Sequence, residues 1–356
     1  MSGTSLDGID AVLACFQPRN GLPDQIQTFY APYSKELKQR LLALHETQPN
    51  ELHLSQMMGA ELADQYSHAV HGLLAQAGVS TSKIRAIGCH GQTIRHRPDA
   101  GYTVQLVNGS RLAELTGITS IIDFRNRDIA AGGHGAPLVP AFHAATLASS
   151  QEHRVIVNIG GIANLTNLPV TGNITGFDCG PGNLLMDAWA AKHLGKPIDD
   201  KGSWAASGKL LPSLLDKMLA NDFFAAIPPK SAGREQFNLD WLRRLLSGNE
   251  AAPDVQATLA ELTARGIVDA ANAHCQDYEA IYVCGGGVHN NALMSKLSVL
   301  AGKPVKSTAV LGIDPDWMEA LAFAWLARQC LHGKPGNLPA VTGAAGSRIL
   351  GAIYPA

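Results

Sequence analysis

The sequence predicts an α/β protein of two similar halves, each containing a glycine turn between two strands. The run Ile9 to Phe16, after MSGTSLDG, is apolar and β-favouring without helical spacing, as in a buried strand. The stretch VIVNIGGIANLT, after Arg154, repeats the order strand, glycine turn, strand. At 356 residues the chain exceeds the size of one ordinary core, so two domains are expected.

The remaining segments alternate between helical and strand patterns. Ser34 is expected to cap a helix, and the apolar period of that layer runs through Leu37, Leu41, Leu44, Met58, Leu62, Tyr66, Ala69 and Leu73. Two short apolar runs, Ile84 to Cys89 and Ile118 to Ile122, predict buried strands that end in polar clusters. AIYVCGGGVHNNALMSKL predicts strand, turn and helix, and DWMEALAFAWLARQCL predicts a long, mostly buried helix.

The composition is that of a compact soluble protein. Hydrophobic residues make up 46% of the chain and charged residues 16%, which is unlike a disordered chain. A net charge of -2 gives no long-range attraction to nucleic acid or to an anionic membrane, so neither is an expected partner. The six scattered cysteines form no CxxC pair, and no apolar stretch is long enough to span a bilayer. A cytoplasmic protein with reduced thiols is expected.

Three glycine turns are candidates for binding a nucleotide. The first, MSGTSLDG, leads into a strand, whereas the Walker and dinucleotide-binding turns lead into a helix. Its backbone N–H groups and hydroxyls could surround phosphate oxygens, with an ordinary hairpin turn as the alternative. The second turn, Asn158 to Asn164, and the third, Cys284 to Asn290, favour the phosphate interpretation because the three occur as an ordered set.

GFDCGPGNLLMDAW is expected to hold Asp178 in a rigid turn, followed by a helix with Leu184, Leu185 and Trp189 facing inward. A carboxylate held in this way suits a general base, which must lie within hydrogen-bonding reach of its proton. An Asx-turn or helix-capping carboxylate is an equal alternative. Asp187 is expected to be an ordinary helical residue.

Two further segments, GCHGQTIRHRP and DFRNRDIAAGGHGAPLVPAFH, concentrate planar polar side chains. Such groups recognise sugars and carboxylates, although an interior polar network would explain several of them. His90 and His96 lie six residues apart and lack the spacing of a helical metal pair, so metal binding by histidine is disfavoured. In PPKSAGREQFN, we expect Lys230, Arg234 and Glu235 to lie in a solvated loop, with a place near the nucleotide as the alternative.

The motifs in this order closely resemble the bacterial anhydro-N-acetylmuramic acid kinases across essentially the whole chain. The resemblance rests on MSGTSLDG, GCHGQTIRH, DFRNRDIAAGGHGAPLVP, NIGGIANLT, GFDCGPGNLLMDAW, KSAGREQFN, CGGGVHN and DWMEALAFAWLA. It implies two duplicated actin-like, ribonuclease H-like α/β domains with an ATP cleft between them. The expected N-terminal domain is 1–127 completed by 339–356, and the expected C-terminal domain is 128–338.

The resemblance also implies an ATP- and Mg²⁺-dependent enzyme of peptidoglycan recycling. The enzyme would open the 1,6-anhydro ring of 1,6-anhydro-N-acetylmuramic acid with water and phosphorylate O6, giving N-acetylmuramic acid 6-phosphate and ADP. Asp178 would be the base that activates the water. The wider superfamily commonly has Asp where this chain has Asn158, so Mg²⁺ is expected to depend on Asp7, through water, and on phosphate oxygens.

The expected binding residues fall into two sets. Nucleotide contacts are expected from Gly3, Thr4, Ser5, Leu6, Asp7, Gly8, Ile9, Asp10, Asn158, Gly160, Gly161, Gly285, Gly286 and Gly287. Sugar contacts are expected from His90, Gln92, Arg125 and Glu319. The alternatives are an ordinary kinase of the same superfamily that acts on a free amino sugar, and a nucleotide-dependent regulatory module. A homodimer is compatible with either enzyme.

The first glycine turn lacks the strand that should precede it. In the superfamily that the chain resembles, this strand lies inside the sheet, and its loss would leave buried neighbours without backbone partners. Met1 is therefore expected to be an internal methionine of a longer natural product.

Overall fold

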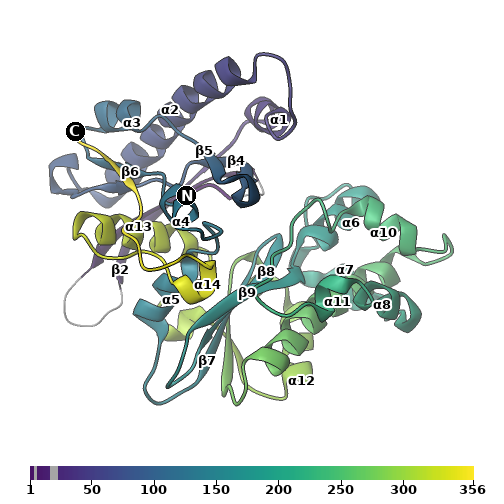
Figure 1. Cartoon of the computed structure of the whole chain (residues 1–356). Helices are drawn as coiled ribbons and strands as arrows, with labels where there is room; N and C mark the ends of the chain where they lie inside the picture. Colours follow the sequence, from purple (N-terminus) through teal and green to yellow (C-terminus); the bar gives the residue numbers. More distant parts are fainter. Residues whose placement is uncertain (4–5, 17–22) are drawn as a thin grey trace. The chain divides into compact units, whose positions relative to one another are not determined.

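The computed structural model describes residues 1–3, 6–16 and 23–356, so Thr4 and Ser5 of the first glycine turn lie outside the described residues. The chain forms two compact units (Figure 1). Unit 1 comprises Met1–Thr146 and Trp317–Ala356, and unit 2 comprises Leu147–Asp316. Both units are mixed α/β, as expected from the sequence.

In the described part of unit 1, the strands pair in three small groups. They are the antiparallel ribbon of β1 (Gly8–Phe16) and β2 (Pro23–Pro32), the sheet β12-β6-β3 (Ala352–Tyr354, Ser120–Ile122, Ile87–Gly88), and the hairpin of β4 (Gln92–Arg97) and β5 (Tyr102–Leu106). Its helices are α1 (Lys35–Ala43), α2 (Glu51–Ala77), α3 (Gly109–Thr116), α4 (Asn126–Ala130), α5 (Val139–Leu147), α13 (Met318–Leu331) and α14 (Pro339–Thr342).

The helical layer of unit 1 confirms the predicted apolar period. Ser34 caps α1, because its hydroxyl accepts a hydrogen bond from the backbone N–H of Leu37 at 3.1 Å. All eight apolar residues predicted for this layer are buried, and seven of them, all except Leu73, pack into one core with Leu6 and Ile9. The mostly buried helix that was predicted is α13, and its residues Met318, Leu321, Ala322 and Trp325 are buried.

Unit 2 is built on one five-stranded sheet with the order β11-β10-β7-β8-β9. Its strands are β7 (Arg154–Ile159), β8 (Ile162–Leu168), β9 (Thr175–Pro181), β10 (Ala280–Cys284) and β11 (Val305–Ser307). Its helices are α6 (Leu184–Leu194), α7 (Ser203–Ser207), α8 (Pro212–Leu219), α9 (Asp222–Ala225), α10 (Leu239–Leu245), α11 (Ala252–His274) and α12 (Asn291–Ala301). Buried α11 packs against β8 and β9 and against α6, α7, α8 and α12.

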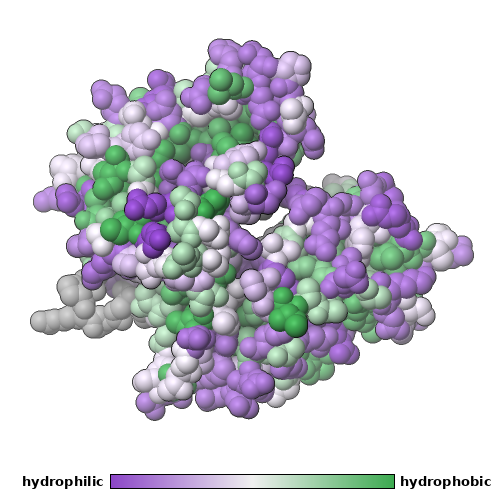
Figure 2. Space-filling model, in the orientation of Figure 1, coloured by the Kyte–Doolittle hydropathy of each residue, from purple (hydrophilic) through white to green (hydrophobic). Residues whose placement is uncertain are grey.

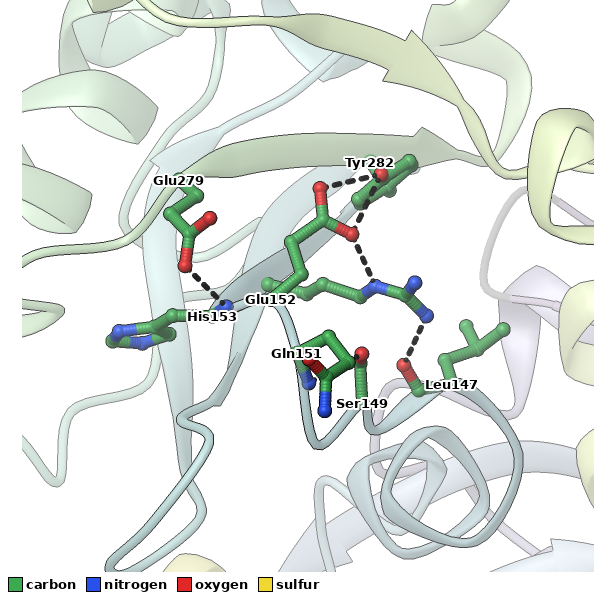
Figure 3. A network of polar contacts seen from close by, with 8 residues as sticks. Leu147, Ser149, Gln151, Glu152, His153, Glu279 and Tyr282 are labelled. Atoms are coloured by element: carbon green, nitrogen blue, oxygen red, sulfur yellow. Dashed lines mark hydrogen bonds and ion pairs between the residues drawn. The ribbon is translucent and has the colours of Figure 1, made fainter.

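A network of polar contacts lies where β7 begins, beside β10 (Figure 3). Arg154 donates to Glu152 at 2.7 Å and to the carbonyl of Leu147 at 2.9 Å. The Tyr282 hydroxyl on β10 donates to the same Glu152 carboxylate at 2.9 Å. β7 and β10 are parallel, so their carboxyl ends lie side by side at the other edge of the sheet. These ends lead into the second and third glycine turns.

Several predicted elements differ from the structure. Asp178 lies in strand β9, paired with Asn164 of β8, and not in a turn, because the glycines of GFDCGPGN continue the sheet ladder. In the following helix, Leu185 and Trp189 are buried, whereas Leu184 is half-buried. The strand predicted over Ile84 to Cys89 is reduced to two residues. The polar run after it forms the β4–β5 hairpin, which the sequence analysis did not predict.

The boundary between the units also differs from the boundaries expected after residues 127 and 338. The structure divides the chain after residues 146 and 316. The difference arises in part because α13 packs against β1 and β3, so that this helix belongs to the core of unit 1.

Hydrophilic and hydrophobic areas are mixed on the face drawn in Figure 2. Across the described ranges, no helix has the length and apolar character needed to cross a membrane.

An apolar groove with a volume of about 680 Å³ lies in unit 1, lined by β1, α2, β3 and α13. At its end, Met1 and Asp10 exchange two backbone hydrogen bonds of 2.7 and 2.8 Å. In an antiparallel ladder this pairing directs the N–H and C=O of Val12 towards the groove as well. On the other wall, Ile87 donates to the carbonyl of Thr119, just before β6, and Cys89 donates to Ile121 of β6, so that the backbone of Gly88 faces the groove.

The strand pattern of unit 2 shows what would fit such a groove. There, β7 lies between an antiparallel partner, β8, and a parallel partner, β10. In the described part of unit 1, β1 and β3 flank the groove and no strand lies between them. The expected further strand stays a prediction, and the groove has the edges that such a strand would pair with.

We predict that an extended apolar segment of about five residues, fused before Met1, pairs with β1 and β3 and stabilises unit 1. Urea unfolding should show a rise in the free energy of unfolding of more than about 1 kcal/mol, because apolar surface is buried and backbone groups gain partners. A matched extension with a central proline serves as the control. Equal stability of the two extended chains would show that no strand enters the groove.

Candidate functional site

Two of the predicted glycine motifs of unit 2 are joined by backbone hydrogen bonds. The carbonyl of Gly161 accepts from the N–H groups of Gly182 and Leu184 at 2.9 and 3.1 Å, and the carbonyl of Gly160 accepts from Asn183 at 2.8 Å. A Cβ atom on Gly182 would lie 2.3 Å from the Gly160 carbonyl oxygen, so only glycine permits this approach. The turn after β7 and the turn after β9 therefore form one rigid structure.

The third glycine turn lies beside the first two. Cys284 pairs with Asn158 in the parallel β10–β7 ladder, which places Gly285 directly after that pair. Gly285 has φ +78°, and a Cβ there would lie 2.3 Å from the side-chain oxygen of Asn158. A Cβ on Gly287 would lie 2.3 Å from a side-chain carbon of Ile159. The structure thus brings the predicted nucleotide residues of unit 2, including Gly160, Gly161 and Gly286, to one edge of the sheet.

Asp178 is a half-buried carboxylate on β9, close to these turns. One of its oxygens, Oδ2, accepts a hydrogen bond from the backbone N–H of Ala232 at 2.9 Å. Burial raises the pKa of Asp178 to about 6, although the Ala232 N–H acts in the opposite direction. A carboxylate with this pKa is ionised near neutral pH and remains basic enough to accept a proton, as a general base must.

Asp187, expected to be an ordinary helical residue, also has an altered environment. It lies in the first turn of α6, and burial, together with the charge of Asp199, raises its pKa to about 7. The charge of Arg234, in the loop of residues 228–237, acts in the opposite direction on the pKa of Asp187.

The first glycine turn is closely packed in unit 1. The side chains of Leu6 and Ile9 belong to the core, whereas Asp7 is exposed. The N–H groups of Leu6 and Asp10 donate to the carbonyls of Gly3 and Met1, and the N–H of Gly8 donates to Asp7 Oδ1. Nucleotide binding by this turn stays a prediction, since several of its N–H groups have internal partners and Thr4 and Ser5 lie outside the described residues.

Arg125 and His90 form a pair in unit 1. Arg125 Nε and Nη2 donate to His90 Nε2 at 3.1 and 3.0 Å, and Arg125 Nη1 donates to the carbonyl of Gly135 at 2.8 Å. The other ring nitrogen of His90, Nδ1, donates to the carbonyl of Gly91 at 2.7 Å. Both ring nitrogens of His90 are therefore used within the protein, so His90 holds Arg125 in place and has no free nitrogen for a sugar.

Electrostatics keep this pair in one protonation state. Burial, followed by the charge of Arg125, holds the pKa of His90 well below its usual value, so the ring is neutral and Nε2 accepts. Burial lowers the pKa of Arg125 to about 10 while the charge of Glu319 raises it, so the guanidinium stays charged. Phe323, one turn after Glu319 on α13, packs on the His90 ring at 4.6 Å. Three of the predicted sugar residues thus lie together.

Gln92 is fully buried next to the first glycine turn. Its Nε2 donates to the carbonyl of Gly3 at 3.1 Å. Its oxygen, Oε1, is buried and has no hydrogen-bond partner within the part of the chain that the structure describes. A buried acceptor of this kind is costly to leave unpaired, so it fits a donor group of a ligand.

Asp128 is a supporting residue whose role the sequence analysis did not assign. Its buried carboxylate accepts from Asn337, Thr342 and the N–H of Gly135 at 2.6, 2.8 and 2.8 Å. The Gly135 carbonyl in turn accepts from Arg125. Asp128 therefore ties the Arg125 site to Asn337 and Thr342, which lie about 210 residues away in sequence, and no local pattern could have revealed this.

Among residues 1–3, 6–16 and 23–356, no group of three or more His, Cys, Asp or Glu side chains could hold a metal ion. Mg²⁺ usually binds through one or two carboxylates, water and substrate phosphates, and the exposed carboxylate of Asp7 beside a glycine turn fits that donor set.

Fold and site together define a class of protein. It is a two-unit α/β protein in which glycine turns suited to anions lie beside a half-buried carboxylate suited to base chemistry. The family model for anhydro-N-acetylmuramic acid kinase matches residues 1–356. The chain therefore belongs to the anhydro-N-acetylmuramic acid kinase family.

Curated relatives support the same assignment. Proteins named anhydro-N-acetylmuramic acid kinase from Nitrosospira multiformis and Nitrosomonas europaea are 57% and 54% identical over 360 residues, covering 100% of this chain and 98% of each relative. The protein of that name from Thiobacillus denitrificans is 56% identical over 360 residues, which cover 100% of this chain and 96% of that protein. A ROK hexokinase structure from Thermus thermophilus covers 90% of this chain and 99% of its own, at a TM-score of 0.36 and 15% identity, too distant to bear on the site.

The pairing of His90 with Arg125 leads to a stability prediction. His90→Leu leaves two half-buried N–H groups of Arg125 without their protein acceptor, which should lower the free energy of unfolding by about 1–3 kcal/mol in urea. His90→Gln places an oxygen near the position of Nε2 and should recover much of this loss. Equal losses in the two variants would contradict the assignment of Nε2 as the acceptor.

Proposed function

We propose that the protein is an ATP-dependent kinase acting on 1,6-anhydro-N-acetylmuramic acid in peptidoglycan recycling. The reaction opens the 1,6-anhydro ring with water and phosphorylates O6, giving N-acetylmuramic acid 6-phosphate and ADP. The observation that carries the proposal is the half-buried Asp178 carboxylate beside the joined glycine turns, in a chain that belongs to this family along its whole length.

Asp178 serves as the general base. It takes a proton from a water molecule while the water oxygen forms a bond to C1 of the sugar. The C1–O6 bond breaks, and its electron pair remains on O6. O6 then attacks the γ-phosphorus of ATP, the bond between that phosphorus and the bridging oxygen breaks, and ADP leaves. The raised pKa of Asp178 supports this role, because the carboxylate must be ionised yet able to hold the proton it receives.

Unit 1 supplies the sugar contacts. Arg125, fixed by His90 and Gly135, presents its remaining N–H groups to an anionic or carbonyl oxygen, such as the lactyl carboxylate of the sugar. Gln92 Oε1 accepts from a hydroxyl or amide of the substrate, which would give this buried atom a partner. Glu319, close enough to Arg125 to affect its pKa, supplies a second acceptor. His90 acts through Arg125 and does not contact the sugar.

ATP binds at the glycine turns, where backbone N–H groups approach an anion closely. The residues Gly3 to Asp10, Asn158, Gly160 and Gly161 serve the phosphates, and Gly285 to Gly287 serve the adenosine end. Mg²⁺, when bound, would neutralise phosphate charge, with Asp7 holding it through water. We place the enzyme in the cytoplasm, where ATP is available, with its sugar and ATP as the partners.

Product analysis tests the substrate assignment. The protein, supplied with ATP and Mg²⁺, should convert the anhydro sugar to N-acetylmuramic acid 6-phosphate with one ADP per turn, as read by mass spectrometry. Asp178→Asn should lower kcat by about 10²- to 10⁴-fold, because the water loses its base. Asp216→Asn, an exposed carboxylate on α8, is the matched control and should leave kcat unchanged.

Transfer to free N-acetylmuramic acid with no action on the anhydro form would contradict the proposal and favour an ordinary amino-sugar kinase. Full turnover by Asp178→Asn would contradict the assignment of the base. Nucleotide binding with no transfer to either sugar would favour a regulatory module.

A further inference from the structure

Lys230 is held on the protein, although PPKSAGREQFN was expected to be a solvated loop. Its ammonium donates to the carbonyls of Phe223 and Phe224 at 3.0 and 3.3 Å. These carbonyls belong to the short helix α9, and the same ammonium lies 4.7 Å from the centre of the Phe223 ring. The side chain of Lys230 therefore anchors the loop to α9 through two carbonyl oxygens and an aromatic face.

The anchored loop contacts Asp178 through two backbone hydrogen bonds. The N–H of Asp178 donates to the carbonyl of Lys230 at 3.2 Å, and the N–H of Ala232 donates to Asp178 Oδ2 at 2.9 Å. One bond fixes the loop against β9, and the other fixes the carboxylate itself. Because Oδ2 has this partner, the rotation of the carboxylate depends on where the loop lies.

The helix that Lys230 grips is itself fixed to β9. Gly180 lies two residues after Asp178, and a Cβ there would lie 2.9 Å from the Phe224 ring. A Cβ on Gly266 of α11 would lie 2.7 Å from the Cys179 carbonyl and 3.2 Å from the same ring. Since α9, β9 and α11 approach one another this closely, the carbonyls that bind Lys230 are at a fixed distance from Asp178.

We propose that Lys230 is a positioning residue for Asp178: by tying residues 230–232 to α9, it holds the Ala232 N–H on Oδ2 and leaves Oδ1 directed at the attacking water. This inference rests on the proposed function, in which Asp178 is the base. Lys230 itself touches no reacting atom.

The pH dependence of kcat gives a readout that a merely structural role would not move. Turnover should rise with pH through about 6, because Asp178 must lose its proton. The Ala232 N–H lowers the pKa of Asp178, so loss of this bond should move the rise to higher pH. Titratable groups on the segments around Asp178 include Lys230, Cys179 on β9, and His274 and Cys275 at the end of α11. Burial raises the pKa of both thiols, so they stay neutral over this pH range.

Lys230→Met tests the proposal, since it keeps the apolar stem and removes the donors. We expect kcat for the anhydro sugar to fall about tenfold, the KM for ATP to stay unchanged, and the acid limb of kcat to move up by about one pH unit. Lys230→Arg keeps a cation and donors and should restore both. Ala232→Pro removes the N–H while leaving the Lys230 charge, so it should move the limb in the same direction.

Each outcome decides between the two claims. The positioning role would be overturned if the acid limb of the kcat profile of Lys230→Met lay at the same pH as in the wild type and kcat per folded molecule were unchanged. If Lys230→Met does not fold, the test uses the pH profile of kcat for Ala232→Pro, together with the ¹³C-carboxyl titration of Asp178 in Lys230→Arg and in the wild type. An acid limb of Ala232→Pro at the wild-type pH would then overturn the positioning role. Full activity of Asp178→Asn would instead remove the proposed function on which this inference rests.

Discussion

The architecture of unit 2 depends on the backbone hydrogen bonds that join the turn after β7 to the turn after β9. The carbonyls of Gly160 and Gly161 accept from three consecutive N–H groups, those of Gly182, Asn183 and Leu184. The approach is so close that Gly182 admits no side chain. Buried carbonyls and N–H groups need partners, and here each turn supplies the partners of the other.

The hydrogen bonds between the two turns also fix the position of Asp178. Because the turn after β9 is fixed, Asp178 is held a few residues earlier in a strand whose other contacts come from β8 and the 228–237 loop. Thr263 of α11 donates to the carbonyls of Pro181 and Gly182 at 3.0 and 2.9 Å, which fixes the same turn against α11. The base is therefore positioned by backbone geometry, and its pKa is set by burial more than by any single charge.

Much of this organisation could be predicted from the sequence, because it is local. Apolar periodicity identified α1, α2 and α13, and glycine composition identified the three turns. The same reasoning placed Asp178 in a turn, because glycine and proline usually end a strand, whereas tertiary pairing with β8 carries the strand through them. Lys230 was expected in solvent, since its acceptors are backbone carbonyls that leave no trace in composition. His90 was expected to contact sugar, and only its two occupied nitrogens show that it supports Arg125.

In the proposed reaction, water opens the anhydro ring while O6 receives the phosphoryl group. Mass spectrometry of the product formed in ¹⁸O-labelled water, reduced at once with borohydride to prevent exchange, tests both steps together. We expect one ¹⁸O atom on C1 and none in the phosphate. The label on C1 should exceed the label that N-acetylmuramic acid gains by exchange when it is treated in the same way without reaction. A phosphorylated product without label on C1, or with label in the phosphate, would contradict the proposed reaction.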